Sequence, residues 1–191
     1  MKRERRAFAD YVDDELCALL DRLHFLDEFG SHLGLTRLCG RAKPGRRVVE
    51  ATPGFSGPHY TTVAALSLAG VKAPWVIEGA MDGTAFIAYA QHELGPALQA
   101  GDILVIDNLS AHKNVEARAL LAARGVRVVF LPPYSPDFNP IELCWSKIKQ
   151  ALRSAKARTF DELLTALREA LLSVTPEQIQ AWFKHCGYAL A

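Results

Sequence analysis

Apolar residues recur at two different spacings along the chain, and the change of spacing separates helices from strands. In the first segment, to about Leu23, apolar side chains return every three or four positions, which predicts a helix. The runs 46–50 and 59–68 are rich in β-branched residues and bounded by Gly and Pro, so they predict strands. Short apolar runs at 24–27 and 75–78 predict two more strands. The chain after the first helix therefore predicts a set of antiparallel strands.

Beyond residue 80 the pattern becomes one of alternating helices and strands. Continuous apolar runs at 102–107 and 126–131 are typical of fully buried strands. Helical spacing is found over residues 82–99, 113–124 and 140–153, and again from Thr159 and from Thr175 onward. Each of these two Thr residues has Glu or Gln three positions later, which is typical of a capping box. The order of elements favours an α/β fold, in which helices pack on a mixed sheet.

The composition is that of one ordinary globular domain, or of one domain with appended helices. Of the 191 residues, 50% are hydrophobic and 23% are charged, which excludes a disordered or fibrous chain. No apolar run approaches the ~20 residues of a membrane span, and the N-terminus lacks the apolar stretch of a secretory signal. We therefore expect a cytoplasmic protein without a membrane partner. The net charge of +1 is low for a stand-alone DNA-binding domain, so any phosphate contacts must be local.

The four cysteines give no sign of a metal site or of a disulfide framework. Cys17, Cys39, Cys144 and Cys186 are widely spaced, with no CxxC pair and no Cys/His cluster at the spacing of a zinc site. Because free cysteines are often buried, we expect four reduced and mostly buried thiols.

Three carboxylates occupy positions where a catalytic metal site can form. Asp27 and Asp107 end two of the predicted core strands, and Glu142 lies in the first turn of the helix after a Pro-rich loop. Carboxylates are ligands that hard divalent ions prefer, and two such ions ~3.5–4 Å apart assist phosphoryl transfer. Each acid also has a structural interpretation. Asp27 and Asp107 are good turn residues, while Asn139, Pro140 and Glu142 are close to a capping box.

Three stretches closely resemble the bacterial insertion-sequence transposases of the mariner superfamily. They are FLDEFGSHLGLTRLCGRAKPGRRV (25–48), DNLSAHK (107–113) and FLPPYSPDFNPIELCWSKIK (130–149). Between Asp107 and Glu142 lie 34 residues, the spacing that marks this group. The resemblance runs from about Leu23 to the C-terminus. It implies a ribonuclease H-like α/β fold, a mixed sheet flanked by helices with extra C-terminal helices, which agrees with the strand order above.

The resemblance also implies a chemistry. Asp27, Asp107 and Glu142 would bind two Mg²⁺ (or Mn²⁺) ions per active site, with Asp107 between the ions. The enzyme would be a DDE transposase or endonuclease that cleaves DNA strands and transfers them during DNA transposition. Relatives usually carry Ser or Thr where this chain has Phe29, which places an aromatic ring near the site. Glu28 points to the other side of the strand from Asp27, so we interpret it as a supporting residue.

Seven further residues are candidates for supporting the metal ligands or for contacting DNA. His112 could position phosphate or water, or it could cap the next helix. The basic residues could bind a DNA backbone without reading bases, or they could form a solvated face. The seven residues are Asn108, His112, Tyr134, Asn139, Lys149, Arg46 and Arg47. Trp145 falls in the apolar row of its helix and is predicted to be a core residue.

The resemblance divides the chain into an N-terminal helical segment (1–22), a DDE catalytic domain (23–155) and a C-terminal helical extension (156–191). Transposases of this family also carry an N-terminal helix-turn-helix region that recognises the terminal inverted repeats. Residues 1–26 leave no room for it, so we expect a split, frameshifted or truncated element.

The expected partners are DNA, both element ends and target, and a second copy of the chain or a partner transposase subunit. The alternative function is a truncated remnant that binds DNA or a partner without autonomous activity. A different ribonuclease H-like nuclease, acting on RNA–DNA hybrids or branched DNA, fits the fold but not the PPYSPDFNPIE segment.

Overall fold

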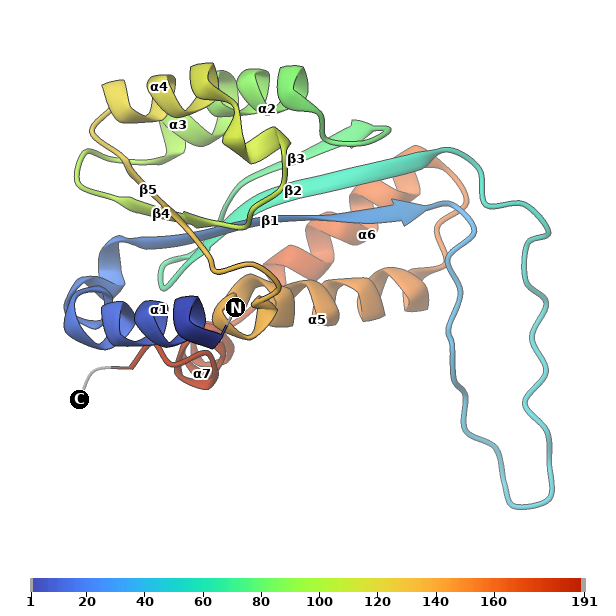
Figure 1. The fold of residues 1–191 in the computed structure, drawn as a ribbon. Coiled ribbons are helices and arrows are strands. Elements are labelled where there is room, and N and C mark those ends of the chain that lie inside the picture. The colour runs from blue at the N-terminus through green and yellow to red at the C-terminus, as the bar shows by residue number, and fades with distance from the viewer. Residues whose placement is uncertain (1, 190–191) are drawn as a thin grey trace.

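Within residues 2–189, which the computed structural model describes, the chain forms a mixed five-stranded sheet between two layers of helices (Figure 1). The strands are β1 (Leu23–His32), β2 (His59–Ser67), β3 (Gly70–Glu78), β4 (Ile103–Ile106) and β5 (Arg127–Phe130). Their order is β3-β2-β1-β4-β5, in which β1–β2 and β2–β3 are antiparallel and β1–β4 and β4–β5 are parallel. The α/β class and the mixed sheet are therefore confirmed.

β1 is the central strand, and both of its faces are covered. Residues 23–27 are all buried, as a continuous apolar run in a central strand requires. Phe25 and Phe29 belong to the core below the sheet in Figure 1, whereas Leu26 belongs to the core above it. This alternation follows from the two-residue period of a strand. One strand therefore supplies residues to both hydrophobic cores.

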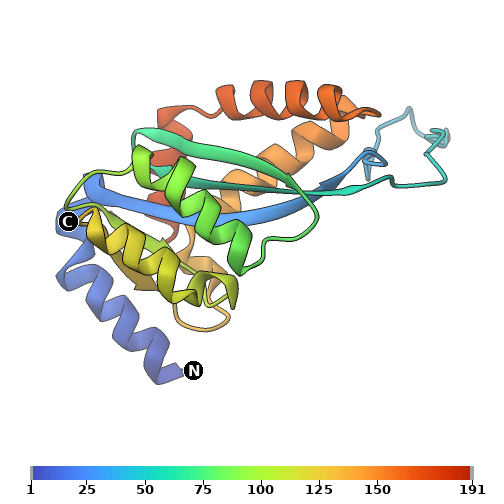
Figure 2. The same cartoon turned by 90° about the horizontal axis from the view of Figure 1, so that it is seen from above.

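The upper layer consists of α2 (Gly83–Tyr89), α3 (Gly95–Ala97) and α4 (Val115–Ala123), which Figure 2 shows lying across the sheet. Asp82 caps α2 as predicted, its Oδ1 accepting from the Ala85 amide at 2.8 Å. The predicted helix over 82–99 is formed as continuous helical backbone from Gly83 to Ala97, with a π-helical turn at Ala90–Leu94 between α2 and α3. Pro96 lacks an amide hydrogen and crowds the carbonyl of the preceding turn, so the hydrogen bonds there shift to a wider spacing.

The lower layer consists of α1 (Lys2–Asp14), α5 (Pro140–Ala155), α6 (Phe160–Leu172) and α7 (Pro176–His185). After α1, 3-10 turns over Leu16–Arg22 lead into β1. Trp145 of α5 is fully buried, which confirms it as a core residue. The capping boxes at Thr159 and Thr175 are both formed, and they confirm where α6 and α7 begin. The apolar side chains of these helices and of the lower face of the sheet form one core.

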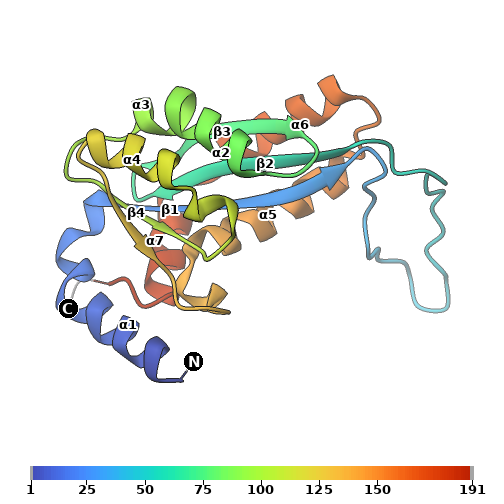
Figure 3. The same cartoon turned by 45° about the horizontal axis from the view of Figure 1, so that its top comes forward.

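A long loop between β1 and β2 extends away from the body of the molecule (Figure 3). The predicted strand at 46–50 lies in this loop and is wrong, since residues 37–56 are exposed and form no ladder. Val48 and Val49 have the right side chains for a strand, but a strand also needs a neighbour and a face to bury. Pro44-Gly45 and Pro53-Gly54 further interrupt the segment.

The cysteines are free thiols, but fewer of them are buried than predicted. Cys144 and Cys186 are buried, Cys17 is half-buried and Cys39 is exposed on the long loop. Among residues 2–189, no helix combines the length and the apolar character needed to cross a membrane.

Gly95 provides a test of the packing at the π-helical turn. An added Cβ would lie 2.6 Å from the Ala90 carbonyl oxygen and 2.8 Å from Arg124 Nε. We expect Gly95→Ala to lower the free energy of unfolding by about 1–3 kcal/mol, measured by urea denaturation. Gly54→Ala is the control, because nothing lies within 4 Å of its added Cβ, and it should change stability by less than about 0.5 kcal/mol. Equal effects of the two substitutions would contradict this account of the turn.

Candidate active site

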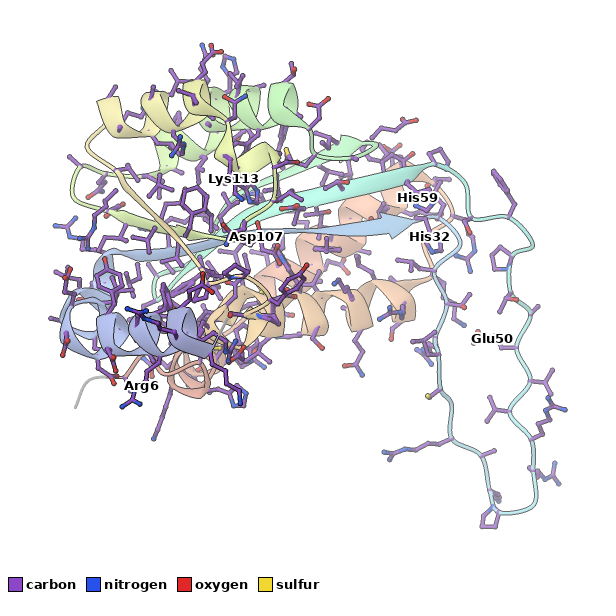
Figure 4. All side chains as sticks on the ribbon, viewed as in Figure 1. Arg6, His32, Glu50, His59, Asp107 and Lys113 are labelled. Carbon is purple, nitrogen blue, oxygen red and sulfur yellow. The ribbon has the colours of Figure 1, made fainter. Side chains whose placement is uncertain are left out.

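The three predicted acids line a cavity of about 500 Å³ beside the C-terminal end of β4. Asp27 comes from β1, Asp107 follows β4 directly and Glu142 comes from the first turn of α5. The Pro-rich segment 131–136 forms the remaining wall. In Figure 4 the labelled Asp107 lies in the middle of the molecule, where the upper layer meets the sheet.

The sequence predicted that Asp27 ends its strand. This prediction is wrong, because β1 continues to His32. What ends is the pairing with β4, which stops at Phe25 and Val105. Continuing this register puts Asp27 level with Asp107, on neighbouring strands about 4.8 Å apart. β1 therefore carries Asp27 beyond the end of a shorter neighbour, and the absence of a paired strand there leaves room for the cavity.

Two hydrogen bonds hold Asp107. Its Oδ1 accepts from the Leu109 amide at 2.8 Å and lies 2.7 Å from Nδ1 of His112. His112 is fully buried, and its Nε2 lies 3.4 Å from Oε2 of Glu28. The imidazole is thus placed between two carboxylates. Glu28 points away from Asp27, as predicted, and through His112 it supports the position of Asp107.

The residues that follow Asp107 fix the same loop. Asn108 Nδ2 donates to the carbonyl oxygen of Leu131 at 2.5 Å, which ties together the segments that follow β4 and β5. The helix-cap interpretation of His112 is wrong, because Asn114 caps α4 by accepting from two amides of its first turn. Asn108 and His112 therefore both act on the structure around Asp107.

Glu142 is half-buried in the first turn of α5. The capping-box interpretation is wrong here, since Asn139 stands at the N-cap position but forms no side-chain cap hydrogen bond. Instead the Glu142 amide donates to the backbone carbonyl of Asn139 at 3.1 Å. The Asn139 side chain is 2% exposed and lines the cavity, and its Oδ1 has no hydrogen-bond partner within residues 2–189. Because the cap does not use the Glu142 carboxylate, it remains available to the cavity.

Two distant segments hold the loop that leads into α5. Arg5 of α1 donates to both carboxylate oxygens of Asp137, at 2.9 and 2.6 Å, and to Ser135 Oγ at 2.7 Å. Its guanidinium lies 5.1 Å from the ring centroid of Phe138. From the C-terminal side, the Tyr188 hydroxyl donates to the Phe138 carbonyl oxygen at 2.9 Å. Sequence reasoning missed this clamp because its partners are 132 and 50 residues apart, and only the folded chain brings them together.

Positive charge reaches the three acids unequally. Burial, followed by the carboxylates of Glu142 and Glu28, raises the pKa of Asp27 to about 8. Burial disfavours the charged form of His112, but its hydrogen bond with Asp107 and the nearby carboxylate of Glu28 outweigh this and raise its pKa to about 9. Burial also favours the neutral form of Asp107, yet the hydrogen bonds from His112 and the Leu109 amide lower its pKa. Asp107 is thus ionised at neutral pH, whereas Asp27 lacks a cation of its own.

The donor atoms fit hard divalent cations. All three acids offer carboxylate oxygens. The raised pKa of Asp27 keeps this carboxyl group protonated at neutral pH, and a bound cation would replace that proton. Among residues 2–189, no group of three or more His, Cys, Asp or Glu side chains could hold one ion together. Mg²⁺ does not need such a group, because it usually keeps several waters and binds one or two carboxylates together with substrate phosphates. The three carboxylates therefore fit divalent ions whose remaining coordination is completed by water and phosphate.

The other candidate residues fall into two groups. Tyr134 lines the cavity, 90% exposed, with a φ of 53°, a left-handed conformation that is rare for a bulky residue. Lys113 also lines the cavity. Its place in the DNLSAHK motif is the sequence signal that could have identified it as a candidate. By contrast, the Lys149 ammonium lies 5.6 Å from the ring centroid of Phe29, outside the residues that line the cavity.

Arg46 and Arg47 are not brought to the cavity. They are exposed on the long loop between β1 and β2. In Figure 4, His32 and His59 mark the point where this loop leaves the body, and Glu50 lies out on its returning arm. These two arginines therefore contribute nothing to the geometry of the acids.

Residues 22–164 match the family model described as DDE superfamily endonuclease. Two curated relatives are similar in sequence. The Transposable element Tc1 transposase of Caenorhabditis elegans is 28% identical over 100 residues, which cover 47% of this chain and 37% of that protein. The Insertion element IS630 uncharacterized 39 kDa protein of Shigella sonnei is 26% identical over 178 residues, which cover 92% of this chain and 51% of that protein. The chain therefore spans about half or less of these relatives.

Solved structures of Mos1 transposase share the fold. The mariner paired end complex with Mn has a TM-score of 0.79 at 16% identity, over 97% of this chain and 58% of that chain. The Mos1 catalytic domain has a TM-score of 0.67 at 14% identity, over 98% of this chain and 90% of that one. The ribonuclease H-like fold predicted from the sequence is thereby confirmed.

Replacing Asp27 should stabilise the metal-free protein. A buried acid whose pKa rises from 3.8 to about 8 on folding favours the folded state only while it is protonated, so stability is lost as the pH rises through this range. We expect Asp27→Asn to raise the free energy of unfolding at pH 7 by about 1–3 kcal/mol. The gain should shrink toward pH 4. Thermal unfolding in EDTA across this range measures it, and a variant less stable than wild type at pH 7 would refute the electrostatic account.

Removing the Arg5 clamp should loosen the loop that carries α5. In Arg5→Ala, Asp137 and Ser135 lose their guanidinium partner. The amides of Phe138 and Asn139, which donate within this loop, should then exchange hydrogen faster, on the order of tenfold. Arg6→Ala is the matched control, because Arg6 is exposed on the same helix (labelled in Figure 4). Faster exchange in the control, or none in Arg5→Ala, would argue against the clamp.

Proposed function

The chain belongs to the DDE superfamily endonuclease family, and we propose that it is a transposase catalytic domain that cleaves and transfers DNA strands with two divalent metal ions. One observation carries the proposal: Asp27, Asp107 and Glu142 come from three separate elements and line one cavity. The similar Mos1 structures support it, since they are complexes of that protein with a transposon end, with Mn and with Mg.

The protein's part in the reaction is to hold oxygen ligands and a phosphate in fixed positions. Two bound Mg²⁺ or Mn²⁺ ions would lower the pKa of the attacking water or 3′-hydroxyl and neutralise charge on the leaving oxygen. Asp27 and Asp107 would bind the ions from the side of the sheet, and Glu142 would bind them from α5. The Leu109 amide and His112 orient Asp107. Because these groups sit on rigid elements, little ordering remains to be done when DNA arrives.

The remaining residues of the cavity suit a phosphodiester. Lys113 supplies a positive charge at its edge, and Tyr134 presents an exposed ring at its mouth. Asn139 supplies a buried side-chain oxygen without a partner, which can accept a hydrogen bond from a bound water. DNA is therefore the proposed substrate, as element end and as target.

Assembly with a second copy or with another transposase subunit is part of the same proposal, since the similar Mos1 structures include paired-end complexes. The alternative of a remnant without catalytic activity is not favoured, because the three carboxylates remain grouped at one cavity whose other residues support them.

The direct test is metal-dependent nicking of supercoiled DNA. We expect nicking with Mg²⁺ or Mn²⁺ and none in EDTA, and a loss of at least about 100-fold in Asp107→Asn or Glu142→Gln, because each removes a ligand charge. Asp10→Asn, an equal change of charge at an exposed position of α1, is the control and should retain activity. If Asp107→Asn nicked DNA as fast as wild type, the proposed function would be wrong.

A further inference from the structure

A second cavity, of about 490 Å³, lies between the outer side of α5 and the start of the long loop. Its polar walls are Arg37 from the loop and Ser146, Gln150, Arg153 and Ser154 from α5. Every one of these side chains can donate hydrogen bonds, and none is an acid. A groove of this composition suits an extended anion.

The groove lies along the same face of α5 as Glu142. Glu142, Ser146, Lys149 and Arg153 are separated by four, three and four positions, so they follow one face of α5. From Glu142 to Arg153 the helix rises about 16 Å. A strand of duplex DNA carries one phosphate per ~3.4 Å of axis, so this row is about as long as five successive phosphates.

The fold leaves these arginines unpaired while it uses their basic neighbours. Lys147 donates to the Ser173 carbonyl and to Gln178 Oε1, and Lys156 pairs with Glu50. Arg37 and Arg153 form no ion pair within residues 2–189. Two cations facing one groove without a carboxylate repel each other, and a bound phosphate would relieve that repulsion.

The loop side of the groove is anchored. Arg158, just beyond α5, donates to the carbonyl oxygens of Leu33 and Leu35, at 2.9 and 3.1 Å. The Gly34 amide donates to the Ser56 carbonyl at 3.1 Å, which joins the two arms of the loop at its base. Arg37 follows two residues after Leu35 and is therefore held near α5, and Glu50 on the returning arm of the loop pairs with Lys156.

We propose that this groove binds the phosphodiester backbone of the DNA strand that continues from the metal-binding cavity, through Arg37 and Arg153. The inference rests on the proposed function and adds a location for the flanking DNA. Arg guanidinium groups bind phosphate in a bidentate manner, and Ser and Gln add neutral donors. Such contacts position the duplex and carry no sequence preference.

The first test is DNA binding in EDTA, which is independent of catalysis. A fluorescent duplex of arbitrary sequence is titrated with wild type, with the double variant Arg37→Gln/Arg153→Gln and with Arg118→Gln, an exposed control on α4. Each arginine that neutralises a phosphate contributes about 0.9 to the slope of log K against log salt, so the double variant should lose about 1.8. Its affinity should fall roughly tenfold, whereas Arg118→Gln should bind like wild type.

Cys39 offers a second readout in the unaltered protein. It lines the groove and is the exposed one of the free thiols described. Bound duplex should slow its alkylation by maleimide, while inorganic phosphate at the same ionic strength should not. Protection by phosphate alone would indicate a small-anion site and overturn the assignment to DNA.

The outcomes separate this inference from the proposed function. Three results would each contradict DNA binding in the groove. They are unchanged affinity and salt slope in the double variant, an equal loss in Arg118→Gln, and no protection of Cys39. Calorimetric titration with Mn²⁺ should give the same affinity in the double variant as in wild type, since its substitutions leave the three acids in place. Loss of Mn²⁺ binding would show a general structural defect and contradict the proposal. Failure of nicking with normal DNA binding in EDTA would contradict only the proposed catalysis.

Discussion

The burial of Asp27 beside two other carboxylates is the constraint on which the rest of this structure depends. Asp27, Asp107 and Glu142 face one cavity, and burial near other negative charges raises the pKa of Asp27 to about 8. Side chains free to move would turn into water, where their charges are solvated and screened. The fold therefore has to hold them together at a cost in stability, as functional sites commonly do. Divalent cations bound to the carboxylates would offset that cost.

Each acid is held by a different kind of support. Asp27 is fixed by the backbone of the central strand, whose pairing with β2 continues after β4 has ended. Asp107 is fixed by side-chain chemistry, through the buried His112. Glu142 is fixed indirectly, because α1 and the C-terminal residues clamp the loop that starts its helix. The terminal segments that the sequence sets apart as additions thus help to position Glu142.

The sequence predicted what local signals determine. Periodicity indicated most helices and strands, capping boxes located the starts of α6 and α7, and motif spacing brought the acids into one hypothesis. The prediction from sequence failed where a contact with a distant part of the chain determines the structure. Val48 and Val49 have strand propensity but no partner strand, and Asn139 has a capping side chain that the fold turns into the cavity wall. Asp27 is mid-strand because β2 continues to pair with β1, and no local pattern records the length of a partner.

Net charge is likewise a property of the whole chain, and it does not record where the charges lie in the fold. A value of +1 argues against DNA binding only if the charges are evenly mixed, and here they are not. Residues 36–49 contain five Arg or Lys and no acid, and residues 143–160 contain five more and no acid. Acids gather instead in residues 10–28. Because salt screens charges beyond about 10 Å, a phosphate lying against α5 responds mainly to the charges of α5 and its nearest neighbours. A near-neutral chain can therefore bind a polyanion wherever its fold keeps the two signs apart.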